Sequence, residues 1–148
     1  MRLICGLLVA CIALHAQTKL ESAEALAFGP NGVLFVGDAA AGAIVALETG
    51  DTKPEPAVER LGLDGIDQTI AALLGVKPSD VRFTDVKVNP ASKAIYVSVT
   101  KGRGPDAAPV ILRVDAKGAL QQVDTAKLKS TRDRKSTRLN SSHITISY

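Results

Sequence analysis

Two segments of this chain repeat the same order of short strands and turns, and this repetition constrains the fold more than any other feature. The first segment spans residues 24–51 and the second spans residues 84–118. Each has an alternating apolar strand, a turn with proline, a second strand, a loop with glycine and a third strand that ends near Asp and Gly. Proline suits the turn because its φ is fixed, and Gly32 can supply a positive φ where the chain reverses.

The two copies match position by position, with one extra residue in the second turn. The matching pairs are Leu26 with Val86, Phe28 with Val88, Pro30 with Pro90, Leu34 with Ile95, and Val36 with Val97. A repeated unit of this kind is typical of propeller blades, and two unrelated hairpin sheets are the alternative. We therefore predict an all-β fold, a β-propeller fragment of about two blades of antiparallel strands with a short helical insert. The blades are expected over residues 17–52 and 83–129.

The copies are offset by 60 or 61 residues, which is longer than one blade of roughly 40–50 residues, so an insert is expected over residues 53–82. Four apolar residues within it have helical spacing and predict one helix face: Ile66, Ile70, Leu73 and Leu74. Asp64 is the expected N-cap, Gly75 the expected end, and residues 78–81 are expected to form one more turn. We expect this helix to decorate the propeller or to cap the space between blades.

The N-terminus has the layout of a secretory signal peptide over residues 1–16. A short basic start precedes the apolar run Leu3–Leu14, and cleavage is expected between Ala16 and Gln17. A buried N-terminal helix is the alternative. The motif before Cys11 resembles a lipoprotein signal, but its apolar stretch is very short, so we expect no lipid anchor. The prediction is a secreted or periplasmic protein with no membrane span after signal removal.

The other end changes character, because residues 130–148 are polar and charged and the apolar alternation stops. Residues 135–148 resemble a tail that occurs on mutually unrelated fragmentary proteins and is similar to translated adapter or vector sequence. We therefore predict a non-native tail over residues 130–148. A native basic tail with a last short strand at residues 144–146 is the alternative.

The two ends also hold the residues that most reactive chemistry needs. Both cysteines and both histidines lie in them, so residues 17–129 contain neither type. This excludes, for that part of the chain, a disulfide framework, a thiolate nucleophile, a zinc site of the usual ligands and a histidine base. The formal net charge of +3 also comes from the ends, since residues 17–129 hold 13 basic and 14 acidic residues. We predict no binding to nucleic acid.

Both copies resemble blades of secreted propellers. Residues 24–38, with Gly-Pro-Asn-Gly before Leu-Phe-Val-Gly-Asp, are similar to blades of NHL-repeat proteins and of the gluconolactonase and strictosidine-synthase-like group. Residues 66–114 look like a group of secreted bacterial propellers with no established activity. The resemblance implies a six-bladed propeller of which this chain is an N-terminal part. Two blades cannot close a ring, so the chain alone is expected to be poorly soluble or partly unfolded.

Two sets of residues are candidate sites. In the loop Lys101-Gly-Arg-Gly-Pro-Asp106, glycines allow backbone amides to approach an anion, and Lys101 and Arg103 supply positive charge. With Asp106 they form the candidate ligand site; a solvated loop with Asp106 paired to Arg103 is the alternative. The lactonase resemblance implies a calcium ligand at the start of an inner strand. Glu24 has this position in the first copy, and Asp85 lies beside the equivalent position of the second copy, so both are candidate calcium ligands.

Other polar and aromatic positions are expected to be structural. Asp38 is expected to bind neighbouring backbone amides and fix its turn. The aromatic residues of the two copies are expected to pack between blades: Phe28, Phe35, Phe83 and Tyr96.

No motif in the sequence indicates a cofactor, and the resemblance suggests calcium. We expect a binding scaffold for an unknown ligand or protein partner. The alternative is a calcium-assisted lactonase-type hydrolase whose other site residues lie in further blades.

Overall fold

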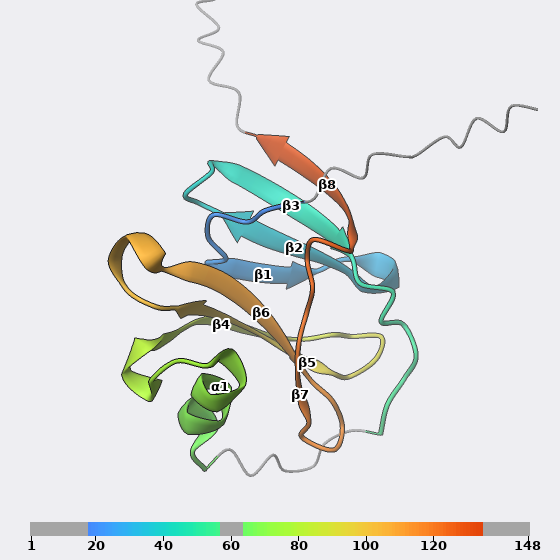
Figure 1. The fold of residues 1–148 in the computed structure, drawn as a ribbon. Helices are drawn as coiled ribbons and strands as arrows, with labels where there is room; N and C mark the ends of the chain where they lie inside the picture. The colour runs from blue at the N-terminus through green and yellow to red at the C-terminus, as the bar shows by residue number, and fades with distance from the viewer. Residues whose placement is uncertain (1–17, 57–63, 135–148) are drawn as a thin grey trace, which may run out of the picture.

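The computed structural model describes residues 18–56 and 64–134. These form two four-stranded antiparallel sheets and one α-helix (Figure 1). Sheet 1 has the order β1 (Ala25–Phe28), β2 (Val33–Asp38), β3 (Ala43–Glu48) and β8 (Lys129–Arg134); sheet 2 has the order β4 (Val81–Val88), β5 (Ile95–Lys101), β6 (Ala108–Val114) and β7 (Leu120–Gln122). The prediction of an all-β chain of about two blades with a short helical insert is confirmed. The predicted signal peptide, the cysteines, the histidines and residues 135–148 lie outside the described residues.

The strand register confirms the repeat. The aligned positions pair across the first hairpin of each sheet: Leu26 with Val36 and Phe28 with Leu34 in sheet 1, and Val86 with Val97 and Val88 with Ile95 in sheet 2. Gly32 has a φ of 70° in the first turn, as expected. A register shift between Phe83 and Asp85 forms a bulge at Thr84 in β4.

The fourth strand of sheet 1 comes from much later in the chain than the other three. β8 pairs with β3 from Ala43 opposite Arg134 to Glu48 opposite Lys129. Residues 130–134, which we expected to begin the tail, therefore form most of a strand. The start of sheet 2 also differs slightly from the expected boundary, because β4 begins at Val81.

The two sheets pack face to face around one apolar core. Its buried members in sheet 1 meet residues of sheet 2; they are Leu26, Leu34, Val36, Val45 and Leu47 against Tyr96 and Ile111. The rings of Phe28 and Tyr96 meet edge to face with centroids 5.0 Å apart, which confirms the packing predicted for both. The same prediction is wrong for Phe35 and Phe83, which are exposed.

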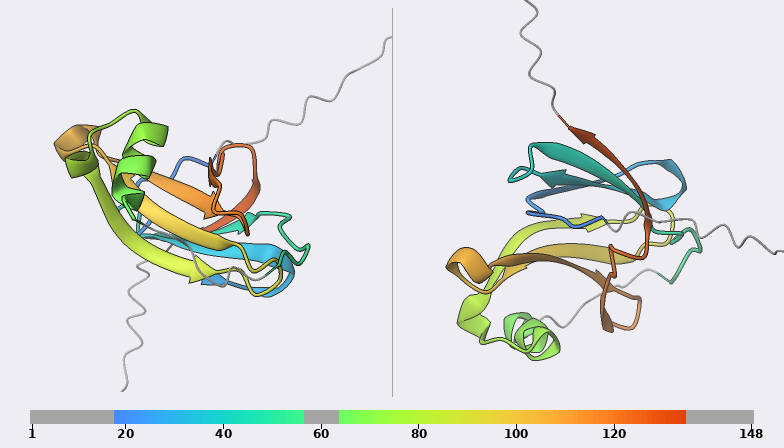
Figure 2. Two further views of the ribbon diagram at one scale, coloured as in Figure 1. Left: turned by 90° about the horizontal axis from the view of Figure 1, so that it is seen from below. Right: turned by 45° about the horizontal axis from the view of Figure 1, so that its top comes forward.

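Helix α1 (Ile66–Leu74) lies on the side of sheet 2 that faces away from sheet 1 (Figure 2). Ile70 is fully buried there in a second core with residues of β5 and β6: Val97, Val99, Val110, Leu112 and Val114. Ile66 and Leu74 are partly buried against this core as predicted, but Leu73 is exposed. In the described part of the chain, no helix is both long and apolar enough to span a membrane.

The predicted helix end is confirmed, and the predicted N-cap is wrong. Gly75 has a φ of 66° and its N–H bonds to the carbonyls that close the helix. At the other end Gly65 is the cap residue, with a φ of 71° and no side-chain cap, so Asp64 does not hold the helix start. The additional turn that was expected after the helix is the 3₁₀ turn Pro78–Asp80.

Candidate functional site

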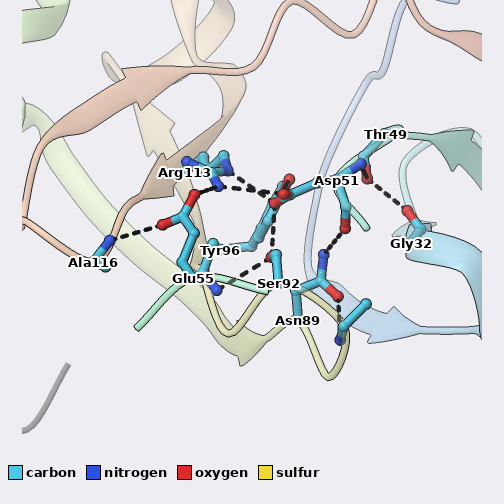
Figure 3. A network of polar contacts seen from close by, with 11 residues as sticks. Gly32, Thr49, Asp51, Glu55, Asn89, Ser92, Tyr96, Arg113 and Ala116 are labelled. Carbon is cyan, nitrogen blue, oxygen red and sulfur yellow. Dashed lines mark hydrogen bonds and ion pairs between the residues drawn. The ribbon is translucent and has the colours of Figure 1, made fainter. Parts of the chain in front are cut away.

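The loop after β3 places a carboxylate against sheet 2 (Figure 3). One Asp51 oxygen, Oδ2, accepts hydrogen bonds from Arg113 Nε at 2.8 Å, from the Tyr96 hydroxyl at 2.9 Å and from the Ser92 hydroxyl at 2.9 Å. Its backbone carbonyl accepts a further bond from Asn89 Nδ2 at 2.8 Å. Asp51, in the loop that leaves sheet 1, thus binds β5, β6 and the turn between β4 and β5 of sheet 2.

Glu55 contacts the same arginine from the other side. Its carboxylate accepts hydrogen bonds from Arg113 Nη2 and, at 2.9 Å, from the Ala116 N–H. Its own N–H donates to the Ser92 carbonyl at 2.8 Å. Arg113 therefore lies between two carboxylates, and its side chain is largely removed from water. We call Asp51, Glu55, Ser92, Tyr96 and Arg113 the polar clamp.

Charge in the polar clamp is stable near neutral pH. Burial acts to raise the pKa of Asp51, but hydrogen bonds from Arg113, Tyr96 and Ser92 outweigh it and lower that pKa below its usual value. The hydrogen bond from Arg113 likewise lowers the pKa of Glu55. Burial and the bond to Asp51 raise the pKa of Tyr96 to about 12. With both carboxylates ionised and the phenol neutral, the arrangement suits an inter-sheet support and not proton transfer.

A cavity of about 320 Å³ lies beside the polar clamp. Its walls include Asp51, Tyr96 and Arg113, together with Gln121 and Gln122 from β7. Asp51 and Arg113 already bind one another here, so the two exposed glutamine amides are the polar side chains with most freedom to contact a ligand.

The face of sheet 1 that points away from sheet 2 is open and apolar. Strand alternation and register place six small or apolar residues on it: Ala25, Ala27, Phe35, Gly37, Ile44 and Ala46. Ile44 is 58% exposed and Phe35 is 39% exposed. A hollow of about 570 Å³ lies where this face meets the turn between β2 and β3. Its lining includes Ala25, Gly37 and Ile44 of the open face, small residues of the turn, and the carboxylates Glu24 and Asp133. We call this surface the open face.

The predicted ligand loop has a different internal pairing from the one expected. Arg103 does not pair with Asp106; its Nε lies 2.8 Å from Asp80 Oδ1, and its Nη2 donates to the Ser79 carbonyl at 2.8 Å. Among the described residues, the side chains of Lys101 and Asp106 form no hydrogen bond or ion pair. A groove of about 450 Å³ runs along this loop. Anion binding by Lys101 and Arg103 stays a prediction.

The two predicted calcium ligands have different roles in the structure. Asp85 Oδ2 accepts the Leu26 N–H of β1 at 2.8 Å, and its Oδ1 accepts the Val86 N–H at 2.8 Å and Lys87 Nζ at 3.1 Å. Asp85 therefore ties β4 to β1. Glu24 is exposed and lines the hollow of the open face. Within residues 18–56 and 64–134, no three Asp, Glu, His or Cys side chains are grouped as a metal site requires, and the calcium site stays a prediction.

The structural role of Asp38 is confirmed. Its side chain is fully buried and accepts the N–H groups of Glu21 at 3.1 Å, Ser22 at 2.8 Å and Ala41 at 3.4 Å. Arg132 of β8 lies 3.3 Å from the same carboxylate. Asp38 therefore joins the chain before β1, its own turn and β8.

The polar clamp is not among the sites predicted from the sequence. One signal was present, because Arg113 interrupts the apolar strand from Val110 to Val114, and an arginine at such a place needs a partner. Nothing in the spacing pointed to Asp51 and Glu55, which lie far from Arg113 in the sequence.

Comparison with protein-family models, with curated proteins and with solved structures finds no match to this chain.

Proposed function

We propose that this chain is part of a secreted propeller-type scaffold that binds a ligand or protein partner through the open face. The observation that carries the proposal is the hollow of about 570 Å³ above a floor of alanine and glycine, beside the exposed Ile44. Contiguous exposed apolar surface is uncommon on monomeric proteins and marks interaction sites. The resemblance of the repeats to NHL-type and gluconolactonase-type blades supports a scaffold of this class.

The surface is held from behind by the rest of the molecule. Leu34, Val36 and Val45 fill the opposite side of the same strands, and the polar clamp and Asp85 join sheet 1 to sheet 2. A surface that is already ordered loses little conformational entropy when it binds, so more of the contact energy is retained as affinity.

The alternative is a calcium-assisted lactonase-type hydrolase with Glu24 as a ligand. The contacts give it less support, because both oxygens of Asp85 already have hydrogen-bond donors. Thermal unfolding in millimolar calcium and in chelator separates the two functions. We expect equal melting temperatures; a rise in calcium that disappears in Glu24→Gln would favour the hydrolase.

An apolar fluorescent dye, anilinonaphthalene sulfonate, tests the binding surface at dilutions where the chain is monomeric. We expect saturable binding that weakens at least about tenfold in Ile44→Lys. Leu73→Lys is the matched control, because Leu73 is also an exposed apolar residue but lies on α1. Equal dye binding by the wild type and Ile44→Lys, or equal loss in both variants, would contradict the proposal.

A further inference from the structure

We propose that the open face binds a second copy of this chain through an apolar strip on β4 of that copy. This proposal rests on the proposed function, since it uses the same surface and identifies the partner that binds there. The strip consists of Phe83, Val86 and Val88, and we call it the β4 ridge.

The β4 ridge is the uncovered part of the face on which α1 packs. Its three residues pair with Val99, Val97 and Ile95 of β5, and paired residues share a face of the sheet. Helix α1 buries the residues of β5 and β6 on this face but leaves Val86 51% exposed and Val88 55% exposed. Within residues 18–56 and 64–134, no element covers the open face or the β4 ridge. These two apolar surfaces lie on the outward faces of the two packed sheets, whose arrangement can be followed in Figure 2.

The two surfaces differ in a complementary way. The open face has small residues such as Ala25 and Gly37 at the hollow of about 570 Å³. The β4 ridge carries larger side chains that stand out from their strand. In the proposed contact, the Phe and Val side chains of the β4 ridge would fill this hollow.

The contact would continue a packing that the molecule already contains. Inside one chain, the buried face of sheet 1 packs on the near face of sheet 2, and Asp85 of β4 bonds to Leu26 of β1. A second copy whose β4 ridge meets the open face repeats this sheet-on-sheet arrangement with the same two strands, each now using its other side.

Charge also favours this orientation. Glu24 and Asp133 line the hollow of the open face. Lys101 pairs with Val81, so it lies on the same face as the β4 ridge. Opposite charges on the two surfaces favour the encounter of ridge with open face over the encounter of two open faces.

Because the two surfaces are different, the association is head to tail, and the copy at each end keeps one surface that can bind a further copy. Sedimentation velocity and light scattering of the chain over a range of concentrations test this. We expect the mass of the wild type to rise with concentration. Ile44→Lys should block the open face, and Val86→Lys should block the β4 ridge. We expect each variant to raise the concentration at which half of the chain is associated at least about tenfold. Leu73→Lys is the control and should behave like the wild type.

The decisive sample is an equimolar mixture of Ile44→Lys and Val86→Lys. Each variant retains one intact surface, so the mixture should form a dimer and nothing larger. Circular dichroism and thermal unfolding check that both variants fold, and Phe35→Ser replaces Ile44→Lys if that variant does not. The proposal fails if the wild type is monomeric throughout, if only Ile44→Lys blocks association, or if association persists in both variants. Dye binding by a monomeric wild type would leave the proposed function standing.

Discussion

Leu26 and Val86 occupy the same position of the repeat, yet Leu26 is 3% exposed and Val86 is 51% exposed. Both pair with a valine of the next strand. The difference arises because the face that holds Leu26 meets sheet 2, whereas the face that holds Val86 meets only a short helix. The local pattern sets strand and register, and the neighbouring layer decides which face is buried.

The two sheets also differ at their far faces. Sheet 2 has α1 over β5 and β6, while the open face of sheet 1 has no covering element among the described residues. The insert thus covers β5 and β6 at one end of the stack, but it leaves the β4 ridge exposed there and leaves the whole open face uncovered at the other end.

Substitution of matched isoleucines measures this difference most directly. Ile70→Ala removes the fully buried side chain that joins α1 to sheet 2, and we expect it to lower the free energy of unfolding by about 2–5 kcal/mol. Ile44→Ala on the open face should change it by less than about 0.5 kcal/mol. Urea unfolding of both variants makes the comparison, and similar costs would show that the open face is covered in solution.

Loss of the polar clamp should weaken the connection between the sheets. Asp51→Asn removes the charge opposite Arg113, whose side chain is only 18% exposed, so we expect a loss of about 2–3 kcal/mol. Asp106→Asn on an exposed loop is the control and should have almost no effect. If Asp51→Asn unfolds at the wild-type urea concentration, the clamp does not join the sheets.

Acid should act on the same connection. The pKa values of Asp51 and Asp85 are lowered in the folded chain, so the unfolded chain binds protons first as the pH falls. Their contribution to stability is therefore complete above the ordinary aspartate pKa of about 3.9 and is lost as the pH falls through the lower folded values. Urea midpoints from about pH 6 to 2 should fall less steeply in Asp51→Asn, and parallel curves would count against the assignment.

The smallest effect is expected at the outer edge of sheet 1. Lys129 of β8 pairs with Glu48 of β3 at 3.0 Å, but both side chains are exposed. Lys129→Ala should therefore cost no more than about 0.5 kcal/mol, measured by thermal unfolding at low and high salt. A larger, salt-independent loss would mean that β8 is held by this pair and not by its backbone ladder with β3.

Alternation and turn chemistry were sufficient to predict the repeat and the helix that begins near Ile66 and is closed by Gly75. They also identified Asp38, since an Asp after a strand and before a turn binds local amides. Strand β8 could not be predicted in this way, because Lys-Ser-Thr-Arg-Asp-Arg has no apolar alternation and its pairing with β3 is decided by a distant edge.

The candidate site was less predictable than the fold. The polar clamp joins residues that are distant in sequence, and only the unpaired appearance of Arg113 indicated it. The exposure of Phe35 and Phe83 could not be predicted either, because both lie in strands whose other aromatic and apolar residues are buried.

The late return of the chain to β3 has a consequence for synthesis on the ribosome. Sheet 2 is made of consecutive hairpins and can form as soon as β7 has emerged. Sheet 1 has only three strands until β8 has been synthesised. During that time the unpaired backbone groups along β3 can pair with another extended chain. We therefore expect that slower pairing of β8 with β3, relative to the encounter of two nascent chains, increases the fraction of chain that aggregates.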